Sequence, residues 1–132
     1  MDNTQAIATL NSLIETLKDG EEGFRTAADG LTDPQTKATF HKYSRERAQM
    51  AQELQAEVRA LGGDPEKAGS VAGSVHRGWI NIKSAVTGKN DASIIAEAER
   101  GEDIAKKAYE EASRAGLPTS ASAVVSRQAT QV

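Results

Sequence analysis

The sequence predicts an all-α protein, and two observations support this fold class. Apolar residues recur at three- and four-residue spacing through most of the chain, and no segment alternates apolar and polar residues over the length of a strand. The composition is also rich in Ala, Glu, Gln, Lys and Arg, which lose little rotamer freedom in a helix. We therefore expect the 132 residues to form one helical domain.

The first two predicted helices form an antiparallel pair. They cover residues 2–29 and 35–61, and each carries a single apolar stripe. Asn3 or Thr4 could cap the first helix, Gly30 suits the position after its end, and Asp33 and Pro34 suit the start of the second. A connection this short makes the two helices neighbours. The stripes consist of Ile7, Leu10, Ile14, Leu17, Phe24 and Ala28, and of Phe40, Tyr43, Met50, Leu54, Val58 and Leu61.

Three further helices are predicted after Gly62-Gly63-Asp64-Pro65, which ends the second helix. Residues 66–73 form a small, polar connector, and a shorter amphipathic helix follows to Val86. Asp91 is a plausible N-cap for a longer helix to Arg114, and residues 119–132 could form a last short helix. The inward-facing residues are expected to be Val71, Val75, Trp79, Ile82 and Val86, then Ile95, Ala98, Ala105, Tyr109 and Ala112, then Ala123, Val124 and Ala129.

Two arrangements of these helices fit the pattern. One is an up-down bundle of the first four helices with a loose tail. The other builds the bundle from 2–29, 35–61, 91–114 and 119 onward, with residues 64–88 as a crossover that carries the Trp79 helix. A long link between the second and third core helices is the connectivity of ferritin-like bundles.

Composition excludes several functional classes. Sixteen Lys and Arg against 19 Asp and Glu give a net charge of −3, so a basic nucleic-acid-binding surface is not expected. The absence of cysteine excludes disulfides, a thiol nucleophile and thiolate metal sites. No apolar run is long enough for a signal peptide or a membrane span. We therefore expect a cytoplasmic protein that binds neither nucleic acid nor membrane.

Five glycines lie inside the predicted helices: Gly20, Gly23, Gly73, Gly78 and Gly101. Each costs about 0.8–1 kcal/mol relative to alanine in a helix interior. We expect close approach between helices to compensate, above all at Gly20 and Gly101. Trp79 is expected in the core, at the side or end of the bundle, whereas His41 and His76 are expected on the surface.

Four runs of the sequence resemble a known family: residues 17–25, 44–48, 69–79 and 97–103. They are similar to a bacterial family of ferritin-like four-helix-bundle proteins of unknown function, related to the ferritin and rubrerythrin-like superfamily. The resemblance covers nearly the whole chain and implies one ferritin-like bundle over residues 1–132. Members usually continue past the position where this chain stops, so the last helix, about 14 residues, is expected to be short or truncated.

The resemblance raises the question of a di-iron site. Such sites take one Glu from each of two helices and a Glu-x-x-His pair from each of the other two. Gln49 stands where the histidine after the second-helix glutamate is expected, and Ser126 and Ala129 occupy the last-helix positions. A complete di-iron site is therefore not expected. The candidate metal ligands are Glu21 (or Glu22), Glu46, Glu99 and Glu102.

A helical wheel points instead to a polar network in the bundle interior. At 100° per residue, Glu21 lies roughly 35°, Arg47 about 30° and Glu102 about 50° from the apolar centre of its own helix. Glu46 and Glu99 lie further off, at about 75° and 110°. A guanidinium repels metal ions and matches two carboxylates, so Glu21, Arg47 and Glu102 are predicted to form a structural network.

Three functions follow as hypotheses. The leading one is a non-catalytic structural or interaction protein without cofactor, which forms a homo-oligomer through apolar faces left open by the short last helix. The alternative is a carboxylate-bound iron protein, iron-binding or oxidase-like, that uses the four glutamates. A third is a bundle that holds a small molecule against Tyr43, Tyr109 and Arg47.

Overall fold

The computed structural model describes residues 2–65, 79, 81–88 and 90–132. Within these ranges the chain forms helices and no strand, which confirms the all-α prediction. None of these helices is both long and apolar enough to cross a membrane. The predicted connector 66–73, most of the predicted helix around Trp79, Gly73, Gly78 and His76 lie outside the described residues. The helices are α1 (Asn3–Gly30), α2 (Pro34–Ala60), α3 (Ile82–Thr87), α4 (Asp91–Ser113) and α5 (Thr119–Ala129).

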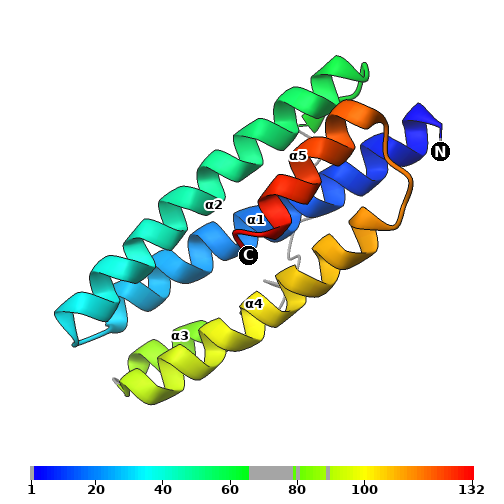
Figure 1. The fold of residues 1–132 in the computed structure, drawn as a ribbon. Coiled ribbons are helices and arrows are strands. Elements are labelled where there is room, and N and C mark those ends of the chain that lie inside the picture. Colours follow the sequence, from blue (N-terminus) through cyan, green and yellow to red (C-terminus); the bar gives the residue numbers. More distant parts are fainter. Residues whose placement is uncertain (1, 66–78, 80, 89) are drawn as a thin grey trace.

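The long helices lie side by side, with α1 in contact with both α2 and α4 (Figure 1). α1 and α2 are antiparallel, whereas α2 and α4 run in the same direction (Figure 1). α5 folds back from the end of α4 and packs against α4 and α2, and α3 packs against α1 and α4 at the opposite end. α5 therefore packs against α2 and α4, and is not a loose tail as in the first predicted arrangement.

Side chains at the helix ends account for the helix boundaries. Asp33 caps α2 by accepting a hydrogen bond from the Thr36 amide, and Pro34 follows at the first position, as predicted. The N-cap of α1 is Asp2 rather than Asn3 or Thr4, in a capping box with Gln5. Two backbone turns after helices use glycine in the left-handed region, at Gly62 (φ 84°) and Gly116 (φ 76°).

The sequence predicted Asp91 as the N-cap of α4, and this prediction is wrong. Asn90 is the N-cap, and its side chain accepts a hydrogen bond from the Ser93 amide. The Asp91 carboxylate instead accepts hydrogen bonds from the backbone amides of Thr32 and Asp33 and from the Thr32 hydroxyl. These bonds hold the pKa of Asp91 below its ordinary value. The contact ties the α1–α2 connection to the start of α4.

The core divides into two clusters along the bundle, which we call the aliphatic half and the aromatic half. In the aliphatic half the buried residues are Leu10, Leu13, Ile14, Leu17, Met50, Ala51, Leu54, Val58, Tyr109, Ala112, Ala121 and Val125. In the aromatic half they are Phe24, Ala27, Ala28, Leu31, Phe40, Trp79, Ile82, Ile94 and Ala98. The aliphatic half contains α5, whereas the aromatic half contains Trp79 and α3.

The predicted inward positions differ in part from the residues that are most deeply buried. In α5 the buried residues are Ala121, Val125 and Gln128, whereas Ala123 is exposed. Val124 and Ala129 are half-buried and pack against the aliphatic half. Tyr43 of α2 is 37% exposed instead of buried, and in α4 Ile94 is buried more deeply than Ile95. A shift of one residue rotates a side chain by 100°, so stripes of small residues define a face poorly.

Two of the interior glycines lie against the ring of Trp79. A Cβ at Gly23 of α1 would lie 2.2 Å from the Trp79 ring, and a Cβ at Gly101 of α4 would lie 2.3 Å from it. The indole is 2% exposed and packs at an angle against the Phe24 ring, with 4.8 Å between centroids. The two glycines therefore make room for a side chain between α1 and α4.

Candidate functional site

An ion pair joins α2 to α4 where the two halves of the core meet. Arg47, only 3% exposed, donates through Nη2 to both carboxylate oxygens of Glu102 at 2.7 and 2.9 Å. Its guanidinium carbon lies 5.6 Å from the Phe24 ring centroid, and Nη1 lies 3.6 Å from the Met50 sulfur. Gly20 leaves room for the arginine stem, since its Cβ would lie 3.5 Å from Arg47 Cγ. The guanidinium thus contacts one residue of each half.

Glu21 is not part of this ion pair. Its half-buried side chain makes no hydrogen bond or ion pair within the described part of the chain. Only its backbone carbonyl is used, and it accepts a hydrogen bond of 2.7 Å from the hydroxyl of Ser44. The structure therefore brings together Arg47 and Glu102 of the predicted network and leaves out the Glu21 carboxylate.

The candidate metal ligands do not converge on one point. Glu46 is half-buried beside Glu53 and Arg127, Glu99 is exposed on α4, and Glu102 is occupied by Arg47. Among the described residues, no group of three or more His, Asp or Glu side chains is placed to hold a metal ion. Among these described glutamates, Glu102 is the least suited to a metal ion, because a cation beside it would be repelled by the paired guanidinium of Arg47.

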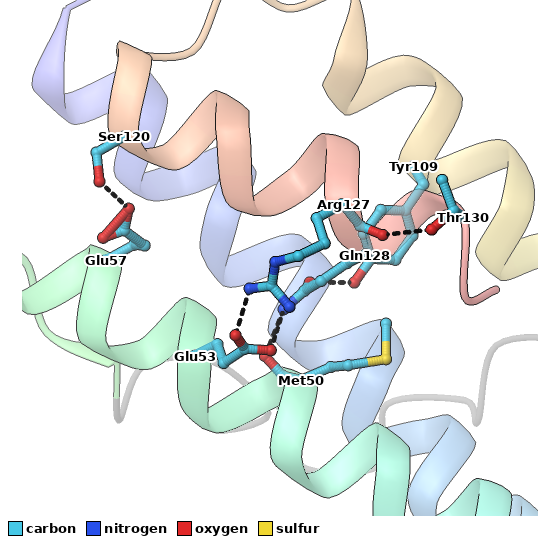
Figure 2. Close-up of polar contacts among 8 residues, drawn as sticks. All are labelled: Met50, Glu53, Glu57, Tyr109, Ser120, Arg127, Gln128 and Thr130. Atoms are coloured by element: carbon cyan, nitrogen blue, oxygen red, sulfur yellow. Dashed lines mark hydrogen bonds and ion pairs between the residues drawn. The ribbon is translucent and has the colours of Figure 1, made fainter.

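A buried hydrogen-bond chain fastens α5 to α4 and α2 (Figure 2). The Tyr109 hydroxyl donates to Oε1 of Gln128 at 2.7 Å, and Nε2 of Gln128 donates to the Met50 carbonyl at 3.1 Å. Gln128 is fully buried and Tyr109 is 1% exposed, and burial raises the pKa of the phenol well above its ordinary value. The polar groups of this contact therefore satisfy one another inside the aliphatic half.

Two further polar contacts hold α5 against the edge of α2. Arg127 pairs with Glu53, and the Ser120 hydroxyl donates to Glu57 at 2.6 Å (Figure 2). The Arg127 hydrogen bond holds the pKa of Glu53 below its ordinary value. α5 thus places apolar residues and Gln128 inward and its basic residue against an acidic edge.

A groove of about 290 Å³ lies between α2 and α4 in the aromatic half, and we call it the α2–α4 groove. Tyr43 packs edge-on against Phe24, with 5.3 Å between ring centroids, and keeps 37% of its surface exposed. Glu102 of the central ion pair forms part of the wall. The lining residues are Phe24, Phe40, Tyr43, Ile95, Ala98, Glu99, Glu102, Asp103 and Lys106.

A known protein family matches most of the chain. A family model described as "Domain of unknown function (DUF2383)" matches residues 5–115. The chain belongs to this DUF2383 family. The matched range contains α2, α4 and every residue that lines the α2–α4 groove. A search of curated proteins found no match for the chain.

Sequence reasoning missed the anchors of α5. Val125 follows Ala121 by four residues and Gln128 follows Val125 by three, so a stripe built on Ala121 and Val125 would have placed Gln128 inward. No local signal identifies Arg127 and Glu53 as a pair, since they are far apart in the sequence. The suggested ligand site at Tyr43, Tyr109 and Arg47 is not formed around one cavity. Tyr43 lines the groove, whereas Tyr109 is buried against Gln128.

Proposed function

We propose that this DUF2383 protein is a non-catalytic interaction protein built as a ferritin-like four-helix bundle, and that its α2–α4 groove binds a helix. The order of the helices, with a crossover between α2 and α4, supports the ferritin-like relationship. The resemblance of four sequence runs supports it as well.

The observation that carries this proposal is the unequal covering of the space between α2 and α4. In the aliphatic half α5 packs against both helices. In the aromatic half the same two helices form the walls of a groove that is lined by Phe40 and Tyr43 of α2 and by Phe24 of α1. Of the three, Tyr43 is exposed, and aromatic side chains in a concave surface are characteristic of sites that bind another molecule. A helix is the occupant we expect, because α5 packs against the same two helices in the aliphatic half.

Iron chemistry receives no support from the arrangement of the carboxylates. Of the four candidate glutamates, Glu102 is paired with Arg47, and no metal-binding group forms among the described residues. We expect ferrous iron, added under argon, to leave the melting temperature unchanged. Bound iron after purification from iron-rich medium, together with a raised melting temperature, would support the iron alternative instead.

A second copy of the chain is a competing occupant of the groove. Homo-oligomer formation predicts a mass above 14 kDa that rises with concentration in light scattering. If the groove forms this interface, Tyr43→Asp will return the protein to the monomer. If the protein is a monomer at all concentrations, self-association is excluded, and the groove must bind a different protein.

The proposal is tested by titrating the isotopically labelled protein with an amphipathic helical peptide that has Leu along one face and Gln elsewhere. We expect amide shifts at Phe24, Tyr43 and Ile95, and their loss in Tyr43→Asp. Ile104→Asp is the matched control, because Ile104 is 39% exposed but does not line the groove. Equal loss in both variants, or shifts confined to other surfaces, would contradict the proposed site.

A further inference from the structure

The α2–α4 groove adjoins the surface of α2 and α4 against which α5 packs. Lys106 lines the groove and also lines a second hollow together with Ala129 and Val132, so the groove begins beside the last residues of α5. On α2, Glu46 and Met50 line a hollow with Arg127 and therefore also border α5. The way in which α5 is bound consequently indicates what this surface accepts.

α5 is bound by an apolar interior and an acidic edge. Val125 and Gln128 are fully buried, while Arg127 reaches outward to Glu53. Glu46 precedes Glu53 by seven residues, so both lie on nearly the same side of α2. The Glu46 side chain makes no hydrogen bond or ion pair within the described residues. It is therefore available to a basic group, as Glu53 is to Arg127.

The opposite wall of the groove is also acidic. Glu99 and Asp103 of α4 line it and are exposed, and neither side chain has a hydrogen bond or ion pair among the residues that the structure describes. Glu102 is neutralised by Arg47, and Lys106 stands at the end next to α5. The free charge in the middle of this wall is therefore negative.

We propose that the occupant is an amphipathic helix of another protein, with an apolar face and Lys or Arg along both edges. This inference rests on the proposed function and adds the chemistry of the partner. Apolar side chains of the helix cover Phe24, Phe40 and Tyr43. Basic side chains on one edge pair with Glu99 and Asp103 of the groove wall, and those on the other edge pair with Glu46 of α2, which lies beyond the groove lining in the hollow beside α5. These charges steer the encounter and select the partner.

The same charges disfavour a second copy in the groove. The chain carries a net charge of −3, and two grooves facing each other would bring Glu99 and Asp103 of both copies together. Like charges opposed across an interface oppose association. Most large apolar side chains of the described helices are already buried in the two halves of the core.

The test uses two helical peptides of about 15 residues, roughly four turns, each held helical by a lactam bridge. Both have Leu along one face, with Arg on both edges in one and Glu in the other. Binding is measured by calorimetry and by the fluorescence of Trp79, the single tryptophan, which packs against Phe24. We expect the Arg peptide to bind, the Glu peptide to bind at least tenfold more weakly, and added salt to weaken the former.

The variant Glu99→Gln/Asp103→Asn removes two groove charges from exposed positions. It should lower the affinity for the Arg peptide by about three- to tenfold. Glu22→Gln/Glu111→Gln is the matched control, with the same change of net charge outside the groove lining, and should change binding by less than about twofold. Equal binding of both peptides, or equal effects of both variants, would overturn the inference about charge. The proposed function would survive that result if Tyr43→Asp still abolished binding.

Discussion

The aliphatic and aromatic halves of the bundle solve the same packing problem in different ways. In the aliphatic half a fourth helix, α5, covers α2 and α4, and a buried chain through Gln128 satisfies the polar groups. In the aromatic half Trp79 fills the space between α1 and α4, against Gly23 and Gly101. The described chain adds no helix on the opposite side, where Tyr43 stays exposed.

This difference separates stability from binding within one fold. In the aromatic half the ring of Trp79 lies between α1 and α4 and the short α3 packs against both, while α2 and α4 line an open groove. Large apolar side chains are stabilising when buried, and those left exposed in a concave surface are a common feature of binding sites. The following predictions test whether the two halves differ in this way.

The largest effect is expected in the aromatic half, at Trp79. Trp79→Ala should lower the free energy of unfolding by about 3–5 kcal/mol, because it empties the space between α1 and α4. Urea unfolding followed by far-UV circular dichroism measures this change. A cost of less than about 0.5 kcal/mol, which is typical of surface positions, would show that Trp79 does not hold this half together.

A second substitution sharpens the same test. Gly23→Ala alone should destabilise by about 1–3 kcal/mol, because its Cβ would overlap the indole. In the Trp79→Ala variant, Gly23→Ala should instead raise the free energy of unfolding, because the ring is gone and alanine favours the helix over glycine. Gly20→Ala is the control: its Cβ would meet Arg47 at an ordinary 3.5 Å, so a neutral or stabilising effect is expected.

The boundary between the halves should be the next most sensitive region. Arg47→Ala should cost about 2–4 kcal/mol, because it removes a buried side chain and leaves Glu102 without its partner. Glu102 is 24% exposed and can regain water, so Glu102→Gln should cost less. Thermal unfolding of both single variants and the double variant measures the coupling. A neutral Arg47→Ala would contradict the structural role of the ion pair.

The aliphatic half is tested at Gln128. Gln128→Leu should cost about 1–3 kcal/mol, because the buried Tyr109 hydroxyl loses its acceptor and the Met50 carbonyl loses a donor. In this variant, backbone amides of α5 should exchange hydrogen faster than in the wild type, while those of α3 should change less, if the halves are separate units. Ser126→Ala, at an exposed position of α5, should stay within about 0.5 kcal/mol of the wild type. Equal exchange in α3 and α5 would contradict the division.

The smallest effect concerns acid and the edge of α5. The pKa of Glu53 is lowered from an ordinary value of 4.5, mainly by the hydrogen bond from Arg127. Its contribution to stability is therefore complete above that unfolded value and is lost as the pH falls through the lower pKa of the folded state. We expect Glu53→Gln to melt below the wild type at about pH 7, and this difference to shrink at about pH 3. Glu22→Gln, at an exposed position of α1, should show no such trend.

The sequence by itself determined the all-α class, the helices and several of their ends. Apolar spacing and the pair Asp33-Pro34 are local features, and a helix forms from local hydrogen bonds and caps, so the boundary at α2 is readable from a short window. The inward direction of Arg47 was predictable for the same reason, because it follows from the angle around its own helix axis.

Only the tertiary structure decided which groups meet. It paired Arg47 with Glu102 and not with the Glu21 carboxylate, assigned Gly23 and Gly101 to Trp79, and turned Gln128 inward beside Tyr109. Periodicity gives an angle about one helix axis, whereas a contact also requires the rotation and axial position of a second helix. Those quantities depend on how all the side chains between the helices pack, and no stretch of sequence carries them alone.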